Sequence, residues 1–330
     1  MISIVMPVKN AAKYLDSSIE SIIDQNHKNW ELIAVDDHST DSSFEILQKF
    51  SKKDSRIHVL PNQGSGIIQA LRTAYAASKG EYIHRMDADD LMPEYKLRQL
   101  LHLLNKNGNG TVATGKVQYF AEGGVNDGYR KYESWLNSLC ENNTHWSEIY
   151  KECVIASPCW MLHRTDFDKC GGFFSNLYPE DYDLVFRFYS EKFKVVSSDM
   201  VLHLWRDHAE RTSRNHKHYA AQSFYHLKLK YFLELEYDPQ KKLVIWGAGQ
   251  KGKRMAKMLK EKNIPFRWTS NNPNKHGKNI YNKILFDLEE SLEGEVQVII
   301  TVAQRNAKSQ IRKFLNQKSL QENRDFWFFS

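Results

Sequence analysis

The sequence predicts an α/β protein built on a mostly parallel sheet flanked by helices. Short apolar runs alternate with amphipathic helical patterns over about the first 110 residues, and this alternation is typical of parallel sheets covered on both faces. Acidic residues follow several of the apolar runs, at the strand ends where such sheets bind ligands. With 330 residues, of which 41% are hydrophobic, the chain is long enough for two domains with full cores.

Three strands and three helices are expected before the first long acidic stretch. The first strand is predicted at Ile2–Pro7, and the helix after it has its apolar side chains on one face. A second strand at Trp30–Val35 ends in two aspartates, and Ser39 or Asp41 can cap the helix that follows. A third strand at Ile57–Leu60 leads into a glycine-containing turn and another helix.

A half-apolar run that ends in three carboxylates is the centre of this region. Tyr82–Met86 predicts a buried strand, Asp87, Asp89 and Asp90 follow it, and a helix is expected to open at Pro93. If the strand continues, Asp87 and Asp89 point to the same side, and carboxylates so close repel unless a cation or protons intervene. Oxygen ligands suit a hard ion such as Mg²⁺ or Mn²⁺. The alternative, a helix cap beside solvated charges, explains one carboxylate well and three poorly.

The amino-acid composition says little about which partners the protein binds or in which cellular compartment it lies. The 46 basic and 40 acidic residues give a net charge of +6, which fits phosphate-bearing ligands or an anionic membrane surface as well as nucleic acid. The apolar runs fall far short of the roughly 20 residues of a membrane helix, and the N-terminus lacks the features of a signal peptide. We therefore expect a cytoplasmic protein, with peripheral contact at the inner face of the membrane left open. The four cysteines lack Cys-x-x-Cys spacing, which favours reduced thiols over zinc ligands or disulfides.

A series of ordered motifs resembles the family 2 glycosyltransferases, which have a GT-A fold. The motifs are Pro7-Val-Lys-Asn10, Val35-Asp-Asp-His-Ser-Thr-Asp41, Lys79-Gly-Glu-Tyr-Ile83, Met86-Asp-Ala-Asp-Asp90, Gly171-Gly-Phe173, Pro179-Glu-Asp-Tyr-Asp-Leu184, Leu204-Trp-Arg-Asp-His208 and Thr212-Ser213. They cover roughly the first 215 residues. Several motifs in order are a strong signal where each alone is weak.

The resemblance implies metal-dependent, inverting transfer of a sugar from a nucleotide-diphosphate sugar, with a UDP-sugar as the expected donor. Asp36 and Asp37 would hold the uracil and the ribose, where the alternative is a solvated turn before a helix. Asp89 would bind the Mg²⁺ or Mn²⁺ that bridges the phosphates, and His208 is a candidate metal ligand or a surface histidine. The further donor-binding residues would be Pro7, Val8, Asn10, Arg85, Asp87, Ala88 and Arg206.

The acceptor is expected to be a glycan or a lipid-linked saccharide, on the side of the second set of motifs. Asp181 is the candidate general base, since three acids in one stretch exceed what an N-cap needs. Glu180 would orient the acceptor, and Trp160 could stack on a sugar face or pack in the core. The competing function is a catalytically silent nucleotide-sugar or glycan-binding protein on the same fold, which has no need of both Asp89 and Asp181. No nucleic acid partner is expected.

Three regions follow from these patterns: a GT-A domain at 1–214, a helical linker at 215–240 and a Rossmann-like domain at 241–330. The linker carries basic and apolar residues, and contact with anionic lipid is its second interpretation. The last region has a strand followed by Gly247-Ala-Gly-Gln-Lys-Gly252, a nucleotide-binding fingerprint. The acid that would complete it is missing at Thr269–Pro273. A module that serves homo-oligomer assembly, acceptor docking or regulation is therefore favoured over a cofactor site.

Overall fold

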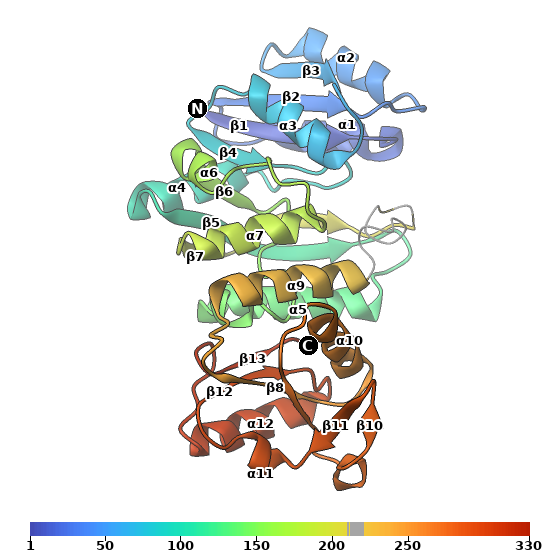
Figure 1. Cartoon of the computed structure of the whole chain (residues 1–330). Helices are drawn as coiled ribbons and strands as arrows, with labels where there is room; N and C mark the ends of the chain where they lie inside the picture. Colours follow the sequence, from blue (N-terminus) through green and yellow to red (C-terminus); the bar gives the residue numbers. More distant parts are fainter. Residues whose placement is uncertain (210, 212–220) are drawn as a thin grey trace. The chain divides into compact units, whose positions relative to one another are not determined.

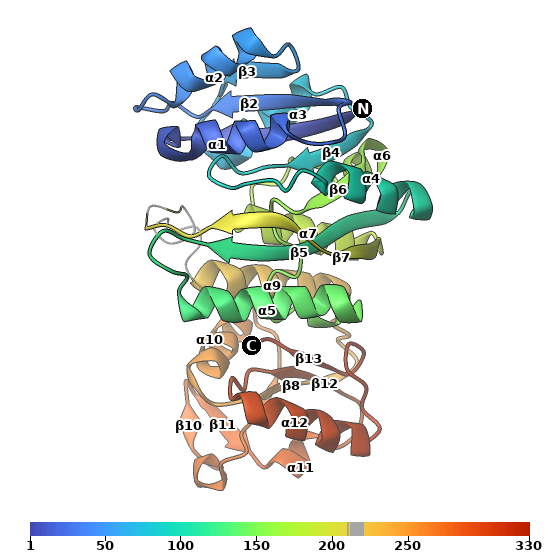
Figure 2. The same ribbon diagram turned by 180° about the vertical axis from the view of Figure 1, so that it is seen from behind.

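The computed structural model describes residues 1–209, 211 and 221–330, which form two compact units (Figure 1 and Figure 2). The first unit comprises Met1–His145 and the described part of Val154–Tyr219, and the second comprises Trp146–Cys153 and the described part of Ala220–Ser330. Residues 146–153 thus belong to the second unit, although the sequence suggested the first domain. The predicted motif Thr212-Ser213 and the start of the predicted linker lie outside the described residues.

The first unit contains a seven-stranded sheet in the order β3-β2-β1-β4-β6-β5-β7. All neighbouring strands are parallel except β6, which is antiparallel to β4 and β5, so the predicted mostly parallel α/β fold is confirmed. The strands are β1 (Ile2–Val8), β2 (Trp30–Asp36), β3 (Ile57–Pro61), β4 (Tyr82–Arg85), β5 (Thr111–Phe120), β6 (Trp160–His163) and β7 (Lys194–Arg206).

Helices cover both faces of this sheet. Figure 1 shows α3 and α7 in front of it, and Figure 2 shows α1 and α4 in front of the opposite face. Strands β1 and β2 are buried almost throughout, which explains why most of their residues are apolar. The helices of this unit are α1 (Ala12–Ile23), α2 (Ser43–Lys53), α3 (Ile67–Ala77), α4 (Lys96–Asn107), α5 (Asp127–Asn142), α6 (Arg164–Lys169) and α7 (Glu180–Ser190).

The parallel pairing brings the sequence motifs to one edge of the sheet. Val8 at the end of β1 pairs with Asp36 at the end of β2, and Val5 pairs with Arg85 at the end of β4. Strand β4 stops at Arg85 and α4 begins at Lys96. The three carboxylates after β4 therefore lie in a loop, where the sequence predicts the strand to end, whereas the helix expected to open at Pro93 begins at Lys96.

The second unit has a six-stranded sheet in the order β10-β11-β9-β8-β12-β13, parallel except for β10. Its first long strand, β8, is central, an order compatible with the Rossmann-like module, which stays a prediction. No helix among the described residues is long and apolar enough to cross a membrane. The elements are α9 (Ala221–Leu235), β8 (Lys242–Trp246), α10 (Gln250–Glu261), β9 (Arg267–Thr269), β10 (Asn279–Ile280), β11 (Lys283–Phe286), α11 (Leu288–Ser291), β12 (Val296–Ile300), α12 (Arg305–Gln317) and β13 (Phe326–Phe328).

Candidate active site

Asp37, just beyond β2, is a buried anchor for the loop after β3. Its carboxylate accepts hydrogen bonds from Asn62 Nδ2 at 2.6 Å and from Gly66 N at 2.9 Å, and it pairs with Lys9 Nζ at 3.1 Å. Gly66 has a φ of +90°, a conformation that favours glycine and allows its N–H to face the carboxylate. Both oxygens of the Asp37 carboxylate thus already have partners within the protein.

Asp36 differs from its neighbour because one of its oxygens is available. Oδ2 accepts from Ser39 N at 3.1 Å, whereas Oδ1 is buried and has no hydrogen-bond partner in the described part of the chain. Asn10 fixes the loop after β2, since its Oδ1 accepts from Thr40 N at 2.8 Å and its N donates to Ser39 Oγ at 2.9 Å. A buried acceptor without a partner is costly, so Asp36 Oδ1 is suited to receive an N–H or O–H of a ligand.

Asp89 and His208 lie in contact although they are 119 positions apart in the sequence. Asp89 Oδ2 lies 2.8 Å from His208 Nε2, and both side chains are partly exposed. Burial acts to raise the pKa of Asp89, but the hydrogen bond with His208 and the charge of Arg211 outweigh it and hold this pKa below its usual value. The other ring nitrogen of His208, Nδ1, is buried without a partner among the described residues.

This pair of side chains fits a hard divalent ion. Two neighbouring ligands of an octahedral Mg²⁺ lie about 3 Å apart when the bonds are about 2.0–2.1 Å, close to the 2.8 Å between Asp89 Oδ2 and His208 Nε2. The described residues contain no cluster of three or more His, Cys, Asp or Glu side chains that could hold a metal. Such a pair would leave the other positions to water and phosphate oxygens, as is usual for Mg²⁺.

Arg85 connects the loop after β4 to the beginning of α7. Its Nε donates to Asp87 Oδ1 at 2.9 Å and its Nη1 to Glu180 Oε1 at 3.2 Å, and the side chain is only 5% exposed. Burial, with the nearby charge of Asp89, raises the pKa of Asp87 against the effect of Arg85. The guanidinium therefore links Asp87 to Glu180, which lies 95 positions beyond Arg85 in the sequence.

Asp181 is the one acid in the first turn of α7 that has no basic partner among the described residues. Glu180 pairs with Arg85 and Asp183 with Arg187, whereas Asp181 accepts only from Tyr182 N, at 2.7 Å. Pro179 occupies the N-cap, so Asp181 does not cap the helix. Burial and the charge of Glu180 raise the pKa of Asp181 to about 7. This environment suits a general base.

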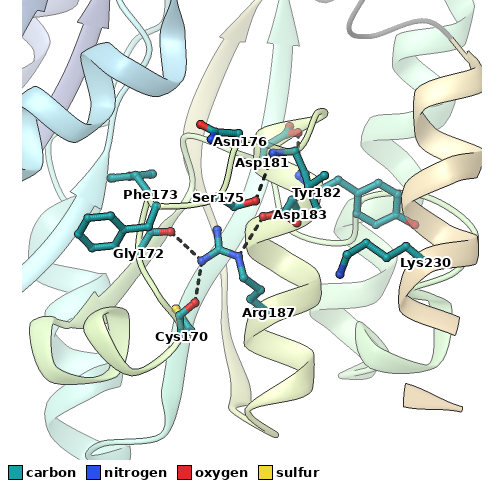
Figure 3. Close-up of polar contacts among 12 residues, drawn as sticks. Cys170, Gly172, Phe173, Ser175, Asn176, Asp181, Tyr182, Asp183, Arg187 and Lys230 are labelled. Carbon is teal, nitrogen blue, oxygen red and sulfur yellow. Dashed lines mark hydrogen bonds and ion pairs between the residues drawn. The ribbon is translucent and has the colours of Figure 1, made fainter. Parts of the chain in front are cut away.

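Two arginines that the sequence reasoning missed hold the loop before α7. Arg187 donates to the carbonyl oxygens of Cys170 at 2.6 Å and Gly172 at 2.7 Å and to Asp183 at 2.9 Å (Figure 3). Arg72 of α3 donates to the carbonyl oxygens of residues 173 and 174 at 2.7 and 2.6 Å. Asp183 and Arg187 stand at i and i+4 on one helix, a spacing visible in the sequence. Arg72 gave no such signal.

Arg206 supports the Asp89 loop from the end of β7. Its Nε donates to the carbonyl oxygen of Asp89 at 2.7 Å, and its guanidinium lies over the rings of Tyr14 and Phe120, 4.8 and 4.5 Å from their centres. The side chain is half-buried. Its predicted contact with the donor diphosphate stays a prediction.

Of the two interpretations of Trp160, packing in the core is confirmed and stacking on a sugar is wrong. Its ring is 1% exposed and stacks on Phe167 with the ring centres 5.7 Å apart, and its carbonyl oxygen accepts from His84 Nδ1 at 2.6 Å. A ring packed in this way belongs to the core and has no face left for a sugar. Val8 and Ala88 are also buried, at 1% and 7% exposure, whereas Pro7 is partly accessible.

Fold and site together define a glycosyltransferase of GT-A fold. The chain belongs to glycosyl transferase family 2, whose family model matches residues 3–171. Glycosyltransferase GlyG of Streptococcus pneumoniae is 35% identical over 216 residues, which are 62% of this chain and 70% of GlyG. The predictions of the family and of a glycosyltransferase enzyme are therefore confirmed. Asp181, Arg206 and His208 lie beyond the residues matched by the family model.

Two solved structures share the fold at low sequence identity. Staphylococcus aureus TarS in complex with UDP-GlcNAc is 18% identical with a TM-score of 0.56, over 72% of this chain and 68% of TarS. The mannosyltransferase PcManGT from Pyrobaculum calidifontis, in complex with GDP-Man and Mn²⁺, is 15% identical with a TM-score of 0.52, over 71% of this chain and 63% of PcManGT.

Proposed function

We propose that this glycosyltransferase moves a hexosyl group from a UDP-sugar to a hydroxyl of a glycan or lipid-linked saccharide, with inversion and with a divalent metal ion. The observation that carries the proposal is the pair of separate acidic centres at one edge of the sheet. Asp89 lies against His208, and Asp181, at the start of α7, forms no ion pair with the basic residues that the structure describes. Arg85 joins the loop after β4 to the start of α7. The metal and donor bound to the neighbours of the same fold support it.

Each acidic centre has its own task in this reaction. A divalent ion held by Asp89 and His208 would neutralise the charge of the departing diphosphate. Asp36 Oδ1 accepts an N–H of the base, and Asp37 maintains the pocket from within. Asp181 removes the proton of the acceptor hydroxyl. At the same time the hydroxyl oxygen of the acceptor bonds to the anomeric carbon of the donor, and the bond from that carbon to the diphosphate breaks. A single displacement of this kind inverts the anomeric centre.

Release of nucleotide diphosphate from a panel of UDP- and GDP-sugars tests the proposal. With an acceptor mixture and Mn²⁺ or Mg²⁺, we expect release from a UDP-sugar, loss of release in EDTA, and an inverted anomeric configuration in the product by NMR. A donor that binds without turnover under every metal condition would contradict the enzyme mechanism and favour a binding protein. Equal turnover in EDTA would contradict the metal assignment alone.

A further inference from the structure

A buried chain of polar side chains runs from α4 to the loop that carries Asp89. Lys96 is 0% exposed, and its ammonium donates to the carbonyl oxygen of Pro158 at 2.6 Å and lies 3.1 Å from His203 Nδ1. The other ring nitrogen of His203, which is also 0% exposed, lies 3.0 Å from Asp90 Oδ2. Burying an ammonium is costly unless its donors are satisfied, so this lysine calls for an explanation beyond packing.

Asp90 joins the two segments that bear the candidate metal ligands. Its Oδ1 accepts from Arg206 N at 2.8 Å, and Arg206 Nε returns to the carbonyl oxygen of Asp89 at 2.7 Å. Backbone hydrogen bonds of 3.0 and 3.1 Å between Leu91 and Leu204 continue the connection. The Asp89 loop and the end of β7, two residues before His208, are therefore held in register through the Asp90 carboxylate.

The chemistry of Lys96 decides which nitrogen of His203 carries the proton. Burial lowers the pKa of Lys96 to about 8, which leaves an ammonium at neutral pH. Burial, with the charge of Lys96, holds the pKa of His203 far below its usual value, so the ring is neutral. An ammonium only donates, so Nδ1 of His203 accepts and Nε2 carries the proton that faces Asp90. In the opposite tautomer the Nδ1–H of His203 would face the ammonium of Lys96, which is also a donor.

We propose that Lys96 is a positioning residue for glycosyl transfer: it fixes the Nε2–H tautomer of His203, which then orients Asp90 and aligns Asp89 with His208. The tautomer itself does not depend on any ligand. Its effect on metal binding rests on the proposed function, in which Asp89 and His208 hold the ion.

The tautomer is measured first, by ¹⁵N NMR of histidine-labelled protein without metal. We expect His203 to be neutral, with a protonated Nε2 and with Nδ1 accepting a hydrogen bond that disappears in Lys96→Met. A protonated Nδ1 or an imidazolium ring in the unsubstituted protein would overturn the proposal. This arm is independent of whether the protein binds a metal at all.

Metal affinity and stability are measured next, by Mn²⁺ titration with EPR detection and by thermal unfolding. We expect Lys96→Met to weaken Mn²⁺ binding about 10- to 100-fold, the usual effect of losing a residue behind a metal ligand. Thermal stability should fall, because the carbonyl oxygen of Pro158 and Nδ1 of His203 lose their buried donor, so Mn²⁺ binding is compared at a temperature at which every variant is folded. Lys106→Met, at an exposed site of the same helix, is the matched control. Tight Mn²⁺ binding retained by Lys96→Met would refute the positioning role.

Substitution of His203 separates its bond to Asp90 from simple space filling. The amide nitrogen of Gln reaches the position of Nε2 and can still donate to Asp90, whereas Leu fills the space without a donor. We expect His203→Gln to keep Mn²⁺ affinity within a few-fold and His203→Leu to lose it as Lys96→Met does. Equal affinities of the Gln and Leu variants would show that the hydrogen bond has no positioning effect.

Discussion

Asp181 and Asp183 are two residues apart on one helix, yet their surroundings give them different chemistry. Asp183 is 1% exposed and neutralised by Arg187, whereas burial and Glu180 raise the pKa of Asp181 to about 7. A general base works in its ionised form. We expect kcat/KM to rise with pH through about 7 and then level off, measured as initial rates with both substrates below KM.

Substitution of the base should remove this dependence. Asp181→Asn cannot accept the hydroxyl proton, and we expect its transfer rate to fall by about 10²- to 10⁴-fold without the rise near pH 7. Asp199→Asn, at an exposed position of β7, should behave like the unsubstituted enzyme. Unchanged transfer by Asp181→Asn would assign the base elsewhere.

The raised pKa of Asp181 also has a consequence for stability. The unfolded chain ionises this carboxyl near its usual pKa of 3.8, while the folded protein keeps the proton up to about 7. Between these values the folded state binds more protons, so the contribution of Asp181 to the free energy of unfolding falls as pH rises. Asp181→Asn should therefore be at least as stable as the unsubstituted protein at pH 8, by urea unfolding.

The two aspartates after β2 should respond differently to the same substitution. Asp37→Asn loses a charged, buried acceptor for Asn62 and Gly66, and we expect the free energy of unfolding to fall by about 1–3 kcal/mol. In Asp36→Asn the amide oxygen can still accept from Ser39 N, so the free energy of unfolding should change little. An NH₂ group in place of Oδ1 cannot accept from the donor, so the KM for the donor should rise. Urea unfolding and donor titration of both variants measure the contrast. Equal loss of stability in the two would contradict it.

At the scale of elements, helix α7 and the loop before it act together because Arg187 joins them. Arg187→Met removes the bonds to the carbonyl oxygens of Cys170 and Gly172 and the bond to the carboxylate of Asp183. We expect the KM for the acceptor to rise about 10- to 100-fold, since small misplacements of a positioned substrate have effects of this size. Donor hydrolysis without acceptor should change little.

The surface pair of Lys169 and Glu191 provides the control for this substitution. Lys169 is 60% exposed and bonds Glu191 at 2.8 Å, and pairs of this kind contribute little. Lys169→Met should leave the KM for the acceptor and the KM for the donor unchanged. If Arg187→Met raised the donor and acceptor KM equally, α7 would have no separate part in holding the acceptor.

Elements were predictable from the sequence where burial dictates a local pattern. Strands β1 and β2 are covered on both faces and are therefore mostly apolar. Contacts between distant segments left no such pattern: Arg85 meets Glu180 across 95 positions, and Lys96 meets His203 across 107. The aromatic content near Trp160 likewise did not reveal which rings are buried. The acidic residues of the site could thus be identified from the sequence. The contacts that basic side chains make with distant segments could be identified only from the fold.

Considering the whole molecule, the second unit carries the glycine fingerprint but has no acid at Thr269–Pro273, where a dinucleotide site would have one. Gly247 has a φ of +129°, and a Cβ at Gly252 would lie 1.8 Å from the carbonyl oxygen of Gly247. These two glycines are therefore needed for the turn and for the close approach of α10 to β8. The presence of Gly247 and Gly252 is therefore explained without a bound ligand.

The end of β9 argues against a nicotinamide cofactor in this unit. Thr269 ends the strand, and Asn271 accepts a hydrogen bond from Trp246 Nε1, whereas a dinucleotide site places an acid here to bind the ribose hydroxyls. We expect calorimetry to detect no saturable binding of NAD or NADP at millimolar concentration, with UDP as the positive control. Micromolar NAD binding that Gly249→Val abolishes would contradict this, because a Cβ at Gly249 meets no protein atom within 4 Å and would obstruct only a ligand.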